Sequence, residues 1–165
     1  MNNNSKNISL ITIFSALYAT AVIVLAPISF GVYQIRLADA LLPLSIIFGI
    51  PGAIGFGLGA FISNLYVNIS LLDVIGGAIA NFIACTLAYY FAKRNGIVYR
   101  FIASIIETVV ITLIVGGYLS VIFNVTIEIS LLGVFGGSIV AINLIGFPIQ
   151  EAIRKSSIYK KILTK

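Results

Sequence analysis

Long apolar runs separated by short polar breaks cover nearly the whole chain. A membrane-spanning helix needs about 20 apolar residues. The runs define six candidate helices, at residues 8–29, 38–50, 51–67, 71–92, 101–123 and 131–153. The second and third runs are short and meet at a Pro-Gly break, Pro51-Gly52, which predicts a hairpin. The pattern therefore predicts an all-α integral membrane bundle of six transmembrane helices, with residues 1–165 forming a single membrane domain.

The composition is that of a protein embedded in the lipid bilayer. The chain is 60% hydrophobic and 9% charged, with a mean hydropathy of +1.14. A soluble domain carries roughly 25% charged residues. We therefore expect an integral protein of the plasma membrane that crosses the bilayer several times.

The basic residues predict the orientation of the bundle. Nine of the ten lie before the first helix, between the fourth and fifth, or after the sixth: Lys6, Lys93, Arg94, Arg100, Arg154, Lys155, Lys160, Lys161 and Lys165. With six spans these positions share one side, which the positive-inside rule makes cytoplasmic. Both termini are then cytoplasmic. The net charge of +5 is a topology signal and gives no reason to expect nucleic acid as a partner.

The exceptional basic residue, Arg36, belongs to a polar cluster between the first two helices, with Tyr33, Gln34 and Asp39. An ionisable group inside a membrane domain is a functional candidate, because burying it is costly. Arg36 and Asp39 are three residues apart and would share a helical face. They form either a salt bridge that ties the loop to the helix, or an arginine fork oriented by Asp39 toward a planar polar ligand entering from outside.

Four further polar residues are candidates for the same ligand. Asn64 near the end of the third helix and Asp73 at the start of the fourth are predicted at the same membrane face as Arg36. Residues 69–79 match residues 129–139 at eight of eleven positions. Asp73 is one of the three mismatches, because the second segment has Gly133 at the equivalent position. It is either a first-turn partner of the helix dipole beside a Ser70 cap, or a ligand contact. Asn81 and Asn143 are placed deeper, where each either joins two helices or contacts the ligand.

Several kinds of chemistry lack their residues in this sequence. There is no histidine and the single cysteine, Cys85, has no partner. Metal or thiol chemistry is therefore not expected, and neither is a cofactor or an enzymatic activity. No G-x-x-x-x-G-K-[ST] run is present, so the chain does not hydrolyse ATP through that motif.

Small residues predict where helices approach closely, since membrane helices pack through them. Gly76, Ala80, Ala84, Ala88 and Ala92 form a row on one face of the fourth helix. The first helix carries Ser15, Ala16, Ala19 and Thr20 at spacings of three and four. This second set either packs inside the bundle or docks a partner subunit.

Several segments resemble the QueT family, small S components of energy-coupling-factor (ECF) transporters. The resemblance is carried by Ala16-Leu17-Tyr18-Ala19, Leu25-Ala26-Pro27-Ile28-Ser29-Phe30-Gly31, Gln34-Ile35-Arg36-Leu37-Ala38-Asp39-Ala40 and Leu71-Leu72-Asp73-Val74-Ile75-Gly76. It implies a six-helix subunit that captures a queuosine precursor, a 7-deazaguanine base, outside the cell. It also implies partners, a transmembrane T subunit and two ATPase subunits, with the small residues of the first helix docking the T subunit. An S component for another vitamin or micronutrient and a stand-alone small carrier are the alternative functions.

Overall fold

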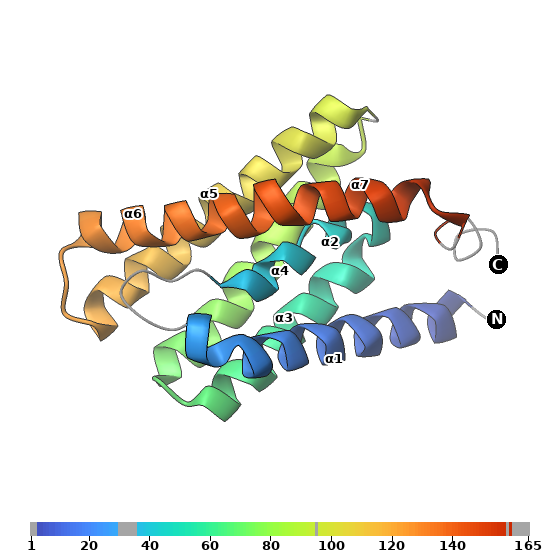
Figure 1. Cartoon of the computed structure of the whole chain (residues 1–165). Coiled ribbons are helices and arrows are strands. Elements are labelled where there is room, and N and C mark those ends of the chain that lie inside the picture. The colour runs from blue at the N-terminus through green and yellow to red at the C-terminus, as the bar shows by residue number, and fades with distance from the viewer. Residues whose placement is uncertain (1–2, 30–35, 95, 158, 160–165) are drawn as a thin grey trace.

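The computed structural model describes residues 3–29, 36–94, 96–157 and 159, and all the regular elements in these residues are helices. In chain order they are α1 (Asn3–Ser29), the 3₁₀ helix η1 (Leu37–Leu41), α2 (Leu44–Phe48), α3 (Ile50–Val67), α4 (Leu71–Ala92), α5 (Ile97–Ile122), α6 (Ile127–Ser138), the π-helix η2 (Ile139–Gly146) and α7 (Phe147–Lys155). The last three elements form one continuous rod, drawn from orange to red (Figure 1).

Within the described residues, five stretches are long and apolar enough to cross a membrane. They are Asn4–Ala26, Ile50–Val67, Leu71–Ala92, Ile97–Ile122 and Ile127–Lys155. The six predicted apolar segments are all helical, but the second corresponds to the shorter stretch Leu37–Phe48. At 1.5 Å per residue it reaches only about 18 Å, less than the roughly 30 Å of a bilayer core. The prediction of a separate spanning helix at residues 38–50 is therefore corrected to a short internal helix.

The short segment lies inside the bundle rather than beside it. Consecutive long helices are neighbours, with α1 against α3, α3 against α4, α4 against α5 and α5 against α6. η1 contacts α1 and η2, and α2 contacts α4 (Figure 1). Because the long helices surround it, this segment can bring polar side chains into the protein interior.

The breaks between helices follow from individual residues. Gly49 separates α2 from α3 with a φ of 72°, and an added Cβ there would lie 3.2 Å from the Tyr89 ring. Asn68 ends α3 in the left-handed conformation, which asparagine tolerates better than most residues. Ser70 caps α4, since its side chain accepts a hydrogen bond from the Leu72 amide at 3.2 Å.

Small residues of α3 and α4 pack helices together, and for α4 the sequence predicts this. A Cβ on Gly59 would lie 2.8 Å from the Ser15 carbonyl oxygen and 2.9 Å from the Tyr18 Cβ, so α1 crosses α3 in close contact there. In the α4 row, Ala80, Ala84 and Ala88 are fully buried. Backbone proximity along these seams, rather than large side chains, holds the helices in register.

We expect Gly59→Ala to lower the unfolding temperature in detergent, because overpacking of a tight core costs about 1–3 kcal/mol. The clash is with backbone atoms of α1, which cannot rotate away. A thiol-reactive fluorophore reports unfolding, since the only cysteine, Cys85, is buried. The control is Gly117→Ala in α5, where an added Cβ meets nothing within 4 Å. Equal unfolding temperatures for the two variants would show that the α1–α3 contact is looser than described.

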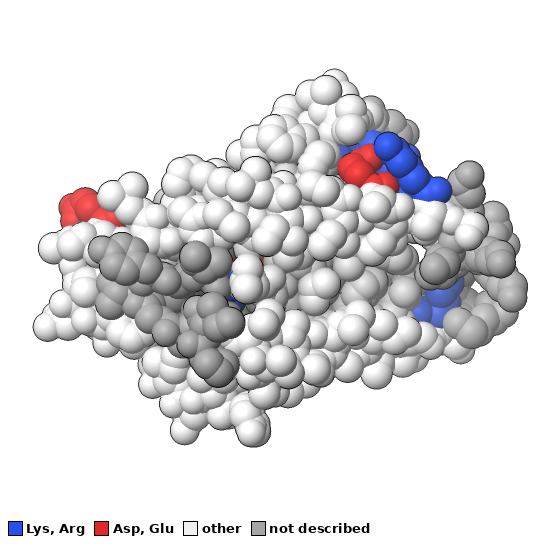
Figure 2. All heavy atoms as spheres, viewed as in Figure 1, with Lys and Arg blue, Asp and Glu red and all other residues white. Residues whose placement is uncertain are grey.

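Charged residues gather at the ends of the bundle. Within the described chain, every basic residue except Arg36 lies near the start of α1, the α4–α5 turn or the end of α7. We call this the basic end. Figure 2 shows blue atoms at the right of the face and a broad white surface beside them. Glu128 is exposed in the first turn of α6 at the other end.

Candidate functional site

Seven polar side chains from α1, α3, α4, α5 and the segment from Arg36 through η1 converge in the half of the bundle away from the basic end. We call them the Arg36 cluster: Tyr18 of α1, Arg36 immediately before η1, Asp39 of η1, Asn64 of α3, Asp73 and Asn81 of α4, and Tyr118 of α5. The η1 segment begins the cluster, because its tight turn holds Arg36 and Asp39 together: the Asp39 amide donates to the Arg36 carbonyl at 2.9 Å. The side chains of both residues then enter the protein interior.

Arg36 is held by α3 and α4. Its Nη2 donates to Asn64 Oδ1 at 2.6 Å and lies 3.9 Å from Asp73 Oδ2. Asn64 Nδ2 donates in turn to the Asp73 backbone carbonyl at 2.8 Å, which ties the end of α3 to the start of α4. The relative exposures of Arg36 and Asp73 are 5% and 1%, so this is an interior ion pair.

The expected direct pairing of Arg36 with Asp39 is corrected. Asp73 is the ion partner of Arg36, while Asp39 Oδ1 accepts a hydrogen bond from the Tyr18 hydroxyl at 2.5 Å. Residues three apart share a face only when both belong to the helix. Arg36 lies outside η1, with φ −78° and ψ 81°, so its side chain leaves the backbone in a different direction from that of Asp39.

Two tyrosines in the cluster escaped the sequence analysis. Tyr18 is fully buried on the inner face of α1, and the Tyr118 hydroxyl donates to Asp73 Oδ1 at 2.8 Å. The sequence did contain a signal for Tyr18, because a tyrosine hydroxyl in an apolar interior usually has a polar partner. Tyr18 lies in the middle of an apolar helix, away from the membrane boundaries where tyrosine is expected.

Glycines of α4 make room for this arrangement. A Cβ on Gly77 would lie 2.5 Å from Asn64 Nδ2 and 3.6 Å from Arg36 Nη1, and one on Gly76 would lie 2.8 Å from the Tyr118 ring. The α4 backbone therefore forms one wall of the cluster. Asp73, Gly77 and Asn81 recur every four residues and share one helical face.

The two deep asparagines differ in their surroundings. Asn81 is buried beside the Tyr18 hydroxyl and interacts with it, although no contact of its amide has full hydrogen-bond geometry. Asn143 accepts from the Thr108 hydroxyl at 2.7 Å and donates to Ser104 Oγ at 2.9 Å. Its amide joins η2 to α5 and makes no described contact with the Arg36 cluster. We therefore include Asn81 in the candidate site and leave Asn143 out.

The other residues predicted for ligand binding or partner docking are Tyr33, Gln34 and the small residues of α1. Tyr33 and Gln34 lie outside the described residues. On α1, Ser15 and Ala19 are buried, with Ser15 against the glycines of α3. Ala16 and Thr20 are exposed. All four residues line one surface groove, with Ser15 and Ala19 at its buried side.

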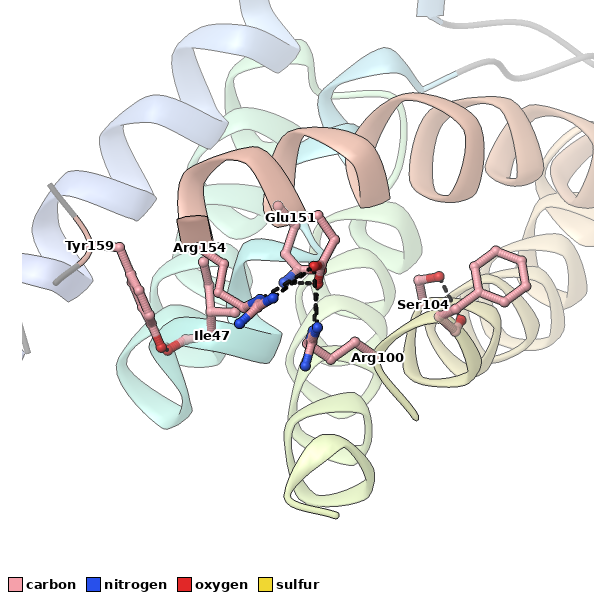
Figure 3. Close-up of polar contacts among 8 residues, drawn as sticks. Ile47, Arg100, Ser104, Glu151, Arg154 and Tyr159 are labelled. Carbon is pink, nitrogen blue, oxygen red and sulfur yellow. Dashed lines mark hydrogen bonds and ion pairs between the residues drawn. The ribbon is translucent and has the colours of Figure 1, made fainter. Parts of the chain in front are cut away.

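A second polar centre lies at the basic end. Glu151 of α7 accepts hydrogen bonds from Arg100 of α5 and from Arg154 (Figure 3). The Tyr159 hydroxyl donates to the Ile47 carbonyl at 3.2 Å in the same region. These contacts fasten α7 to α5 and α2. Glu107 is also structural by its surroundings, since it is fully buried and accepts from Ser45 Oγ at 3.0 Å.

The cluster therefore offers one guanidinium, two carboxylates, amides and hydroxyls in a protein interior that faces lipid on its outside. Within the described residues, no group of three or more metal-binding side chains is present. These groups suit the recognition of a small polar molecule through hydrogen bonds and charge.

Comparison with known proteins gives the family. The family model described as QueT transporter matches residues 8–155. No curated protein matches the chain, and no solved structure matches it. The match covers α1 from Ile8 to the end of α7 and contains all seven members of the Arg36 cluster. The chain therefore belongs to the QueT transporter family and is a multi-pass plasma-membrane component of a transporter, not an enzyme.

Proposed function

We propose that this chain is the substrate-capturing S component of an ECF-type importer. The observation that carries the proposal is the Arg36 cluster, a set of buried polar groups in the half of the bundle away from the basic end. If the positive-inside rule holds, the basic end and both termini are cytoplasmic and the cluster lies toward the outside. A subunit that captures its ligand outside and has no ATP-binding motif requires partners that supply the energy.

The proposed ligand is a queuosine precursor of the 7-deazaguanine type. Such a base is flat and carries a lactam edge and an exocyclic amine. The Arg36 guanidinium donates hydrogen bonds, the carboxylates of Asp39 and Asp73 accept them, and the Asn81 amide does both. Tyr33 and Gln34, at the end of the segment before Arg36, complete the proposed set. The chemistry of these groups supports a flat polar base over an apolar ligand.

The proposed partners are a transmembrane T subunit and two ATPase subunits. Grooves lie on both sides of the exposed α1 residues Ala16 and Thr20, of about 660 Å³ beside Leu41 and about 390 Å³ beside Leu58. Small side chains between two apolar grooves allow a helix of another subunit to approach closely. We propose that Ala16 and Thr20 form the docking face together with Ser15 and Ala19, which line the second groove at its buried side.

Uptake of a labelled 7-deazaguanine base by cells tests the proposal. We expect uptake only when this chain, the T subunit and both ATPases are produced together. Ala16→Leu should abolish uptake while leaving binding to the purified chain intact, because the larger side chain blocks the docking face. The control is Gly136→Leu on α6, where the surface is open.

The alternatives give different outcomes in the same assay. Uptake that survives deletion of the ATPases would identify a stand-alone carrier, for which the buried Glu107 is the ionisable candidate. ATPase-dependent uptake of a vitamin, with none of the base, would keep the S component and change its substrate.

A further inference from the structure

An apolar hollow of about 300 Å³ lies on the outside of the bundle between α3 and α4, and we call it the α3–α4 groove. The two helices are in close contact there, because a Cβ on Gly57 would lie 3.2 Å from Phe82 Cβ and 3.3 Å from the Ala78 carbonyl oxygen. The larger side chains of Phe61 and Phe82, each 42% exposed, border the groove. Lipid tails are as apolar as these side chains, so the groove suits an acyl chain.

One face of α4 connects this groove to the basic end. Phe82, Thr86, Tyr90 and Lys93 follow one another at spacings of three and four, so they lie along one side of the helix. At 1.5 Å per residue, Phe82 and Lys93 are about 16 Å apart along the helix axis. One leaflet contributes half of the roughly 30 Å hydrocarbon core. A lipid with its headgroup at Lys93 therefore has the ends of its acyl chains at the groove.

Lys93 carries a charge that the protein does not neutralise. Its side chain is exposed, and its ammonium nitrogen lies 4.4 Å from the centroid of the Tyr90 ring and 5.0 Å from that of Tyr89. The ion pairs of the described residues use Arg36, Arg100 and Arg154 and leave Lys93 without a carboxylate. Tyrosine and lysine at the end of a span are typical of the headgroup level. An anionic headgroup supplies the missing charge.

The same charge disfavours a second copy of the chain as the occupant of the groove. Two copies that meet on this face in one membrane orientation would bring their Lys93 ammonium groups toward each other, and like charges repel. A zwitterionic lipid fits the apolar groove equally well but brings no net charge to Lys93. Charge complementarity therefore selects an anionic lipid.

We propose that the α3–α4 groove is a binding site for an anionic phospholipid, whose headgroup lies on Lys93 and whose acyl chain fills the groove. This site lies on the outer surface of α3 and α4 and does not depend on the proposed substrate. Lys93 then serves in lipid recognition as well as in the orientation of the chain in the membrane.

A single tryptophan can report which lipid fills the groove, because the sequence contains no other. The full chain with Phe82→Trp is placed in mixed vesicles of phosphatidylglycerol and phosphatidylcholine, and quenching is compared when one or the other lipid carries brominated acyl chains. We expect a preference for phosphatidylglycerol of about fivefold, which corresponds to about 1 kcal/mol, the attraction of one lysine to an anionic surface. Adding Lys93→Gln should reduce the preference to about twofold or less.

Two controls separate a site from the general attraction of basic residues to anionic lipid. Lys155→Gln removes an exposed charge from the basic end on another helix and should leave the preference unchanged. Val109→Trp provides a reporter outside the groove, where the native side chain is 43% exposed. It lies about 18 Å along α5 from Ile97, a similar depth to that of Phe82. We expect a preference of about twofold or less at this position.

Equal affinity of the two lipids at the Phe82→Trp reporter would overturn the proposal. A preference of the same size at the Val109→Trp reporter, or one that Lys93→Gln does not change, would also overturn it. If neither lipid quenches the groove reporter while both quench the one on α5, protein covers the groove and the lipid proposal is wrong. Should Phe82→Trp not fold, Phe61→Trp on the α3 side of the groove gives the same measurement.

Discussion

Arg36→Ala is expected to abolish ligand binding and to destabilise the bundle by about 3–5 kcal/mol, the usual cost of leaving a buried charge without its partner. The change removes the ion partner of Asp73 and the donor to Asn64 Oδ1. Unfolding is followed through the reactivity of the buried Cys85 thiol, and binding through calorimetry with a 7-deazaguanine base. Arg94→Ala is the matched control, because Arg94 is exposed at the basic end.

A double variant separates the role of Arg36 in folding from its role in binding. Asp73→Asn removes the charge that Arg36→Ala leaves unpaired, so the pair of changes should restore much of the lost stability. It should not restore binding, because the guanidinium that meets the ligand is still missing. If folded Arg36→Ala protein keeps its affinity for the base, Arg36 only ties the segment before η1 to α3 and α4.

Gly77→Ala is expected to weaken ligand binding by about tenfold or more, the equivalent of 1.4 kcal/mol. The new Cβ would lie 2.5 Å from Asn64 Nδ2. Asn64 must then move, and it loses its hydrogen bonds with Arg36 and with the Asp73 carbonyl. The methyl group also projects from the α4 face between Asp73 and Asn81.

Gly77→Ala should also lower the stability, by at most about 2 kcal/mol. The two hydrogen bonds that Asn64 loses contribute about 0.5–1.5 kcal/mol each, and the helix preference of alanine over glycine offsets about 1 kcal/mol of that loss. The control Gly136→Ala has the same helix preference without a neighbour within 4 Å. Equal affinity of the two variants for the base, with both folded, would place the ligand elsewhere in the protein.

Hydrophobic patterning predicted most of the fold. Helix α4 has the predicted bounds, 71–92, because Ser70 caps its start and charged residues follow its end. The second segment was wrongly predicted to span the membrane, because an apolar run of this length also fits a short helix buried inside the bundle. Sequence patterning does not show that α1, α4 and η2 enclose it.

The site was predicted in part, for a related reason. Arg36, Asp39, Asn64 and Asp73 were recognised because charged and amide groups are rare in this chain. Their pairing was not, since Tyr18 bonds Asp39 across 21 residues and Tyr118 bonds Asp73 across 45. Local spacing carries no information on contacts between distant helices.

The docking face shows the same limit. The small residues of α1 were predicted to pack inside the bundle or to dock a partner. Ser15 packs against Gly55 and Gly59 of α3 while Ala16 is exposed, and both line one groove. The spacing alone does not show which helix packs against α1.

Equilibrium binding of a labelled 7-deazaguanine base to the purified chain is the decisive measurement for the Arg36 cluster. We expect saturable binding at one site per chain in wild type, retained in Gly136→Ala and lost or strongly weakened in Gly77→Ala. The absence of saturable binding to folded wild-type protein, or binding that is unchanged in Gly77→Ala, would contradict the claim that the Arg36 cluster captures the base.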